Sequence, residues 1–220
     1  MTAFKTIYQD AIKQKGSKEA IQDILPEIQT TQTLSKQTDD RYLSLMAKGI
    51  FCAGFVWRVV EQKWPHFEKA FRNFDINTVS QFGIADIDAL TQDASIIRNH
   101  QKIVSVYENA KFIQTIQEQH GTFAHFIAQW PTNNIIGLWD NLKKQGKRLG
   151  GMTGPYFLRR AGKDTFLLTH DVTQTLIRYQ VLTKAATSKK DLQHVQNTFN
   201  QWHQETGLPY AHLSRILACF

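Results

Sequence analysis

The sequence predicts an all-α protein of about ten helices, built as one two-lobed helical domain. Apolar residues recur at spacings of three and four along most of the chain, which is the period of a helix with one buried face. No segment shows sustained alternation of apolar and polar residues bounded by turn dipeptides, as strands would require. The chain has 220 residues and is 42% apolar, so it can bury a substantial core.

The clearest helix covers residues 96–120, where apolar residues keep helical spacing and Gly121 supplies a C-terminal stop. Residues 42–64 are apolar on most of the circumference, so we expect a central buried helix that ends before Pro65. Gly49 and Gly54 inside this segment indicate either close packing or a break.

Shorter helices are expected at residues 75–82, 84–93, 122–130, 134–146 and 155–162. Ser188 and Asp191 have capping-box spacing and would open a helix that continues to residue 205. The first 35 residues, rich in Lys, Gln and Thr, predict one or two weakly specified helices. We therefore divide the chain into an N-terminal helical extension, residues 1–40, and a helical domain, residues 41–220.

Composition excludes several classes of protein. No run of about eighteen uncharged apolar residues occurs, and charges interrupt the apolar block that a signal peptide would need near the N-terminus. We therefore expect a cytoplasmic protein that has no contact with a membrane. Cys52 and Cys219 form no spaced set, so neither a disulfide framework nor a zinc finger is indicated. No cofactor is expected.

Positive charge is concentrated near the C-terminus. The net charge is +7, and residues 141–220 carry 12 Lys or Arg against 4 Asp or Glu, whereas the first 140 residues are nearly balanced. Such a distribution favours a polyanionic partner, because each phosphate that a protein neutralises releases condensed counterions. The alternative is a solvated basic surface with no partner.

The stretch KRLGGMTGPYFLRR, residues 147–160, places three glycines and a proline between two basic pairs. It joins two predicted helices, so the glycines would form a short turn whose backbone can approach a ligand. Pro155 at a helix start presets φ, and the helix N-terminus favours an anion. We expect a phosphate-binding element formed by Gly151, Met152, Thr153, Gly154, Lys147, Arg148, Arg159 and Arg160. An ordinary corner between two helices is the structural alternative.

Three segments resemble the DNA-3-methyladenine glycosylase I family. LGGMTGPYF, residues 149–157, is similar to the helix-hairpin-helix element of the wider glycosylase superfamily, with Thr153 in place of the usual second glycine. AGFVWRVVEQKWPHFEKAFRNFD, residues 53–75, and DIDALTQDASIIRNHQKIVSVYENAKFI, residues 86–113, are similar to conserved segments of the family in the same order. The resemblance covers residues 42 to 180, with the hairpin near 138–162.

The resemblance implies a base-excision repair enzyme that bends duplex DNA, everts an alkylated purine such as 3-methyladenine and hydrolyses its N-glycosidic bond. An enzyme cannot attack a base inside the stack, so backbone contacts and a side chain that fills the vacancy must offset unstacking. By position, Trp57 would stack on the extruded base, with Gly49 and Phe51 in the base pocket, and Phe55 would be the wedge. Core packing is the alternative for Phe55 and Trp57. The expected partner is duplex DNA with a damaged base, bound by a monomer.

This sequence departs from the family at two sites, the base pocket and the zinc ligands. Thr169 stands where most of the superfamily has a catalytic Asp, which the methyladenine-specific branch also lacks, and Asp171 becomes the candidate if the register slips by two. Gly49, preceded by Lys48, stands where the family has a pocket carboxylate. The zinc ligands of the family are also missing, and His212 and Cys219 are too far apart along a helix to share one ion, so we expect no metal.

Three functions therefore remain open from the sequence. The first is an active glycosylase whose base pocket is altered. The second is a non-catalytic relative that binds DNA and has lost methyladenine recognition. The third is a helical interaction protein whose basic face binds another acidic partner.

Overall fold

The computed structural model describes residues 3–220, in which fourteen α-helices, two short 3-10 helices and no strand occur. The all-α prediction is confirmed, and the helices outnumber the ten expected because several are only one or two turns long. None of the helices in this described range is long and apolar enough to cross a membrane. The chain forms two compact units, which we describe separately: unit 1 comprises residues up to 28, 131–138 and 162–220, and unit 2 comprises 29–130 and 139–161.

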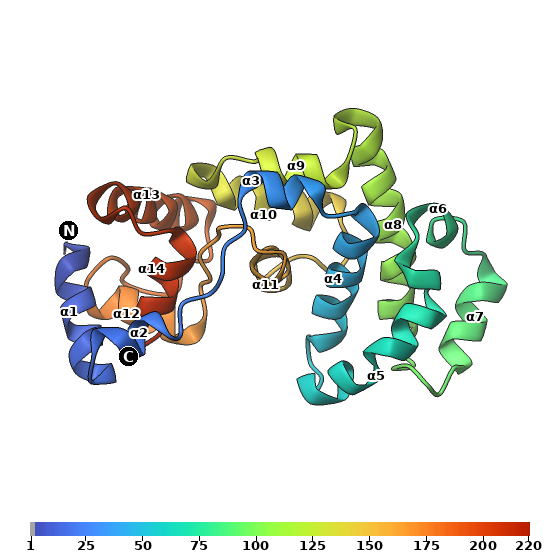
Figure 1. Ribbon diagram of the computed structural model, residues 1–220, viewed down its shortest axis with the longest axis horizontal. Coiled ribbons are helices and arrows are strands. Elements are labelled where there is room, and N and C mark those ends of the chain that lie inside the picture. Colours follow the sequence, from blue (N-terminus) through green and yellow to red (C-terminus); the bar gives the residue numbers. More distant parts are fainter. Residues whose placement is uncertain (1–2) are drawn as a thin grey trace. The chain divides into compact units, whose positions relative to one another are not determined.

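Unit 1 brings both ends of the chain together, seen as blue and red ribbons in Figure 1. Its helices are α1 (Phe4–Lys15), α2 (Lys18–Gln22), η2 (Thr132–Asn134), α12 (His170–Arg178), α13 (Lys189–Thr206) and α14 (Tyr210–Leu217), and α10 (Ile135–Gln145) begins in this unit. Helix α1 packs on α13 and α14. The Phe4 ring lies 5.3 Å from Trp202, and Phe166 stacks on Phe199 at 4.3 Å between ring centroids. The first 28 residues therefore share a core with the C-terminal helices, a division different from the boundary expected near residue 40.

Unit 2 is organised around one central helix, α4. Its elements are α3 (Thr31–Lys36), α4 (Asp39–Cys52), α5 (Trp57–Ala70), η1 (Arg72–Phe74), α6 (Ile76–Val79), α7 (Ile84–Gln92), α8 (His100–His120), α9 (Phe123–Gln129), the end of α10 and α11 (Thr153–Arg160). Helix α4 contacts α5, α8, α9 and α11 (Figure 1). This burial on several sides explains why the α4 sequence is apolar on most of its circumference.

The single helix expected over residues 42–64 is wrong in one respect, because the structure breaks it into α4 and α5. Residues 53–56 form the break, and Gly54 has φ +77°, a left-handed conformation that favours glycine. Pro65 lies inside α5 and does not end it. The carbonyl freed by Pro65 belongs to Glu61, and both residues are exposed, so water can satisfy that carbonyl.

Other boundaries follow the expected signals. Helix α8 ends at Gly121, which has φ +82°, and the Ser188–Asp191 capping box opens α13. Helix α11 begins at Thr153, two residues before Pro155, so the proline lies in its first turn. The N-terminal helices predicted as weak are short: α1 has twelve residues, and α2 and α3 have five and six.

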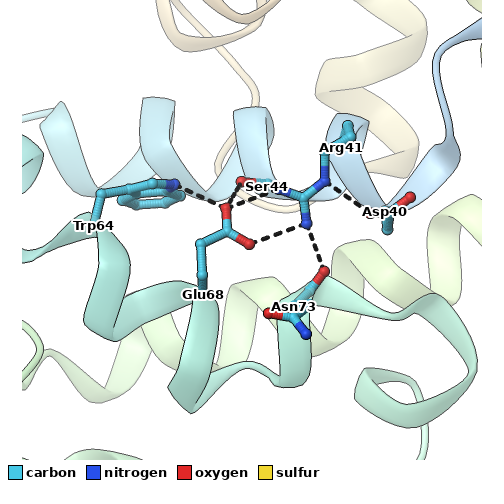
Figure 2. A network of polar contacts seen from close by, with 6 residues as sticks. All are labelled: Asp40, Arg41, Ser44, Trp64, Glu68 and Asn73. Carbon is cyan, nitrogen blue, oxygen red and sulfur yellow. Dashed lines mark hydrogen bonds and ion pairs between the residues drawn. The ribbon is translucent and has the colours of Figure 1, made fainter.

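A polar network, here called the Glu68 cluster, fixes α5 against the N-terminal part of α4 (Figure 2). It consists of Asp40, Arg41, Ser44, Trp64, Glu68 and the backbone carbonyl of Asn73. Arg41 donates two hydrogen bonds of 3.0 Å to the two oxygens of Glu68. Ser44 Oγ and Trp64 Nε1 donate to Glu68 Oε1 at 2.7 and 3.1 Å. The hydrogen bonds to Glu68 raise the pKa of Arg41, so this ion pair stays charged.

Candidate nucleic-acid interface

The glycine-rich turn, residues 146–152, connects α10 to α11 and lies at the surface of unit 2. Lys147, Arg148 and Gly151 are exposed. Asn109 on α8 is fully buried and anchors the turn, because it accepts a hydrogen bond from Lys147 N at 2.8 Å and donates one to Lys147 O at 3.0 Å. The turn is therefore held at its base while its basic side chains face solvent.

The tip of this turn presents backbone donors. Within residues 3–220, the N–H groups of Gly151 and Met152 donate no hydrogen bond. Gly151 has φ +59°, which favours glycine, and a Cβ on Gly154 would lie 2.5 Å from the carbonyl oxygen of Leu149, so position 154 requires glycine. Unpaired N–H groups beside the N-terminus of α11 suit an anion such as a phosphate.

The exposed basic side chains of the turn already have surface partners. Lys147 Nζ lies 3.7 Å from Glu108, and Arg148 Nη2 donates to Gln101. Ion pairs between exposed groups contribute about 0–1 kcal/mol, so a phosphate can replace them at little cost. Arg159, in the last turn of α11, is half-buried.

An exposed apolar ridge follows the break after α4. Phe55, Val56, Trp57 and Val59 are 41, 68, 52 and 41% exposed, and they are among the few large apolar side chains so exposed in the described part of the chain. Core packing, the alternative reading of Phe55 and Trp57, is therefore excluded. Contiguous exposed apolar side chains typically mark an interaction site.

Lys102 on α8 is buried beneath this ridge and contacts the backbone that precedes it and the Phe55 ring. Only 6% of Lys102 is exposed, and its ammonium donates to the carbonyls of Ala53 at 2.6 Å and Phe51 at 3.3 Å, at the C-terminus of α4. The same ammonium lies 4.5 Å from the ring centroid of Phe55. Burial, followed by the charge of Arg148, lowers the pKa of Lys102. Lys102 thus ends α4 and holds the Phe55 ring in place.

Trp57 forms an aromatic and cationic stack with two residues of α11. The Arg160 guanidinium carbon lies 4.5 Å from the Trp57 ring centroid, and the Tyr156 ring meets Trp57 edge-on at 6.2 Å and 86°. Tyr156 and Arg160 are four residues apart, so they lie on one face of the helix. The glycine-rich turn that begins α11 therefore belongs to the same unit as Trp57 and is linked to it by α11.

Gly49 of α4 completes this arrangement. A Cβ built on Gly49 would lie 3.4 Å from Arg160 Nη1 and 3.8 Å from Thr153 Cγ2. Within residues 3–220, Arg160 forms no ion pair and no hydrogen bond, and its contacts are with the Trp57 and Tyr156 rings. A guanidinium thus lies beside the position at which the resemblance implies a carboxylate.

The remaining expected site residues lie elsewhere. Phe51 is fully buried and packs on Phe67 at 4.6 Å between ring centroids, as part of the core of unit 2. Thr169 and Asp171 belong to unit 1. Thr169 is the N-cap of α12 and accepts a hydrogen bond from Val172 N at 3.3 Å, and Asp171 is exposed in the first turn.

The zinc site that the resemblance implies does not fit this chain. In the described residues, no group of three or more His, Cys, Asp or Glu side chains could hold a metal ion. His212 Nε2 is hydrogen-bonded to the carbonyl of Pro26 at 3.0 Å, and Cys219 Sγ donates to the carbonyl of Arg215 at 3.6 Å. In this region of unit 1, the hydrogen bond between His212 and Pro26 joins the N-terminal and C-terminal segments directly.

Two residues of this interface, Tyr156 and Lys102, were not predicted from the sequence. The spacing of Tyr156 and Arg160 places them on one helical face, a signal that could have indicated a shared contact. No pattern along the chain indicated that this contact is Trp57, which is about a hundred residues away in sequence. The same is true of Lys102 beneath Phe55.

The family profile described as methyladenine glycosylase matches residues 30–148. Two similar curated proteins are the DNA-3-methyladenine glycosylase of Haemophilus influenzae and DNA-3-methyladenine glycosylase 1 of Escherichia coli. Each is 31% identical over 75 residues, or 34% of this chain. The match spans only 40% of the length of each relative.

Solved structures share the fold. A Staphylococcus aureus 3-methyladenine DNA glycosylase I, solved for the structural basis of 3-methyladenine recognition, superposes with a TM-score of 0.53 at 23% identity, covering 64% of this chain and 82% of its own. The Methanocaldococcus jannaschii 8-oxoguanine DNA glycosylase superposes with a TM-score of 0.58 at 12% identity and covers 96% of this chain and 91% of its own. At these identities the likeness concerns the fold alone.

Proposed function

Because the chain belongs to the methyladenine glycosylase family, we propose that it is a DNA glycosylase of base-excision repair. It would evert an alkylated purine from duplex DNA and hydrolyse the N-glycosidic bond. The named relatives are DNA-3-methyladenine glycosylases, and the protein would act in the same way on duplex DNA that contains a damaged base.

One observation carries the proposal: a single compact unit presents both an exposed aromatic ridge and a basic turn with unpaired N–H groups. Eversion requires a strand held through its phosphates and a side chain that enters the vacated stack. The turn at 146–152, with Lys147 and Arg148, would hold the strand. Phe55 would be the wedge, since its exposed ring is supported by Lys102, and Trp57 would stack on the extruded base.

Hydrolysis of an alkylated purine needs modest chemical help. Where alkylation at a ring nitrogen makes the purine a good leaving group, positioning of the base and of a water molecule supplies much of the acceleration, and a neutral alkylated purine needs in addition a donor to the negative charge that develops on it. The groups proposed to order that water are Thr169 and Asp171, and their assignment rests on the resemblance alone.

Release of alkylated bases tests the proposal directly. The purified protein is incubated with alkylated duplex DNA, and the released bases are identified by mass. We expect release by the wild type and a loss of about 100-fold in Trp57→Ala, because a stacked base contributes about 1–3 kcal/mol. Ile84→Ala, an exposed apolar change outside the ridge, serves as the matched control. No release above the Trp57→Ala background would exclude the enzyme.

A non-catalytic DNA-binding relative is the second candidate. The observation that favours it is the guanidinium of Arg160 beside Gly49, because a cationic base such as 3-methyladenine would be repelled there. Duplex binding without release of any base would support this candidate.

The salt dependence of duplex binding distinguishes these two candidates from an interaction protein that binds another acidic partner. Phosphate binding predicts that the logarithm of the affinity for duplex DNA falls steeply with the logarithm of salt concentration. Lys147→Ala and Arg148→Ala should each lower that slope by about 0.9. A flat response in the wild type would exclude the phosphate-binding turn.

A further inference from the structure

We propose that the stack of Trp57 and Arg160 selects an electrically neutral alkylated purine and rejects a cationic one. The selected purine carries hydrogen-bond acceptors on its exposed edge, which Arg160 binds. This inference rests on the proposed glycosylase function and specifies its substrate class.

The first step of the argument is that Arg160 is held weakly and can be recruited. Within residues 3–220 its guanidinium forms no hydrogen bond or ion pair, and it lies 4.5 and 6.0 Å from the centroids of the Trp57 and Tyr156 rings. A cation–π contact at a partly exposed site is weaker than a charged hydrogen bond to an acceptor. Since the residue Trp57 is 52% exposed, an incoming base can reach it, and Arg160 can exchange its contact with the Trp57 ring for a hydrogen bond to that base.

The second step is the charge at this site. In residues 3–220, no carboxylate pairs with Arg160, so its charge is not neutralised. The next cation toward the N-terminus of α4, Lys48, is paired with Glu61 at 2.7 Å. A cationic base about 5 Å from the guanidinium would lose roughly 100-fold in affinity at an effective dielectric constant of about 20.

The third step is the chemistry of the leaving group. When the C1′–N9 bond breaks, its electron pair stays on the purine, water adds its oxygen to C1′ and a proton of that water is released. A cationic alkylpurine leaves as a neutral molecule, whereas a neutral purine leaves as an anion and then takes up a proton. Arg160 donates to the acceptors of that purine and stabilises the negative charge as it develops. The positive charge of Arg160 therefore hinders binding of a cationic alkylpurine and assists release of a neutral one.

Gly49 keeps Arg160 available. A side chain at this position would touch Arg160 Nη1, and a carboxylate there would pair with the guanidinium. The bare Gly49 thus leaves the charge of Arg160 directed toward the base.

Two methylated guanines separate charge from size. Within DNA, O6-methylguanine is neutral and carries the acceptors O6 and N7, whereas 7-methylguanine is cationic, and the two released bases are isomers of equal mass. Single-turnover release from duplexes containing each base is measured by mass, with spontaneous release subtracted. We expect release of O6-methylguanine at least tenfold faster than enzymatic release of 7-methylguanine. Faster release of 7-methylguanine would overturn the inference and leave the proposed function standing. A duplex treated to contain 3-methyladenine is run in parallel: its release without release of O6-methylguanine would overturn the inference alone, and release of none of the three bases would overturn both.

Two variants assign the preference to Arg160. Arg160→Gln should slow release of O6-methylguanine by about 100-fold, the size of effect seen when a donor to a developing negative charge is removed. Arg58→Gln removes the same charge from the exposed residue next to Trp57, and it should keep the preference for the neutral base. Equal effects of the two variants would overturn the inference.

Gly49→Glu provides the converse change. It should pair with Arg160 and shift the preference toward 7-methylguanine by at least tenfold, with the circular dichroism spectrum and the affinity for undamaged duplex checked in parallel. An unchanged preference in a folded Gly49→Glu protein would count against the role of Arg160.

Discussion

Two guanidinium groups lie along the central helix α4, and their surroundings differ. Near its N-terminus, Arg41 binds both oxygens of Glu68 and the carbonyl of Asn73 (Figure 2). Toward its C-terminus, Arg160 lies beside Gly49 and over the Trp57 and Tyr156 rings, and within the described chain it forms no hydrogen bond or ion pair. The first arginine is saturated with acceptors and holds helices together. The second has unused donors and faces an exposed tryptophan, so it is available to a ligand.

The N-terminal end of α4, where Arg41 lies, also stabilises an unusual turn. Arg72, Asn73 and Phe74 have φ values of 53, 55 and 59°, a left-handed conformation that non-glycine residues adopt at a cost. Arg41 binds the central carbonyl of this turn at 2.7 Å, and the Phe74 ring stacks on Trp64 at 5.6 Å. This end of α4 thus uses its polar groups for structure, and it orients α5, which carries Trp57.

The largest expected effect on stability comes from breaking the Glu68 cluster. Glu68→Ala leaves Arg41, Ser44 and Trp64 without their common acceptor, and we expect a loss of about 3 kcal/mol in the free energy of unfolding. Urea denaturation followed by circular dichroism measures it. Glu61→Ala is the control, because Glu61 is itself exposed and has a single partner in the described residues, Lys48, so the pair contributes about 1 kcal/mol. Similar losses in both variants would remove the distinction between a saturated and a solvated site.

An intermediate effect is expected at the anchor of the glycine-rich turn. Asn109→Ala removes both hydrogen bonds to the backbone of Lys147 and leaves buried space, so we expect a loss of about 2 kcal/mol. The same variant should weaken duplex binding, since the turn loses its fixed conformation. Denaturation and a duplex titration at one salt concentration test both effects. A stable variant with unchanged duplex affinity would show that the turn needs no anchor.

The smallest expected effect distinguishes the two arginines directly. Arg160→Gln should change the free energy of unfolding by less than about 1 kcal/mol, because only cation–π contacts are lost. Arg41→Gln should cost about 2 kcal/mol, a value kept moderate because the Arg41 side chain is 41% exposed. The two variants are compared by denaturation under identical conditions. A larger loss in Arg160→Gln would make Arg160 a structural residue and contradict its availability to a base.

Local signals explain how much of the fold could be predicted. Gly121 and Ser188 are caps whose effect lies within one turn, and they bound the end of α8 and the start of α13 as predicted, whereas α8 begins at His100, four residues after the start expected at residue 96. The two glycines of the α4–α5 segment indicated either close packing or a break: the chain breaks at Gly54, and Gly49 packs beside Arg160. The helix was wrongly expected to end before Pro65, because water can hydrogen-bond the carbonyl that a proline frees in an exposed helix.

The sequence by itself determined the helical class, the caps and the glycine-rich turn, because helical periodicity and backbone preferences act over a few neighbouring residues. The tertiary structure alone decided the partners of the charged groups. Nothing near Arg41 or Arg160 in the chain shows that one meets Glu68 and the other meets Trp57, since these contacts join distant segments. The charge of a candidate base site is set by such contacts, so the packing of α11 against α4 determines it.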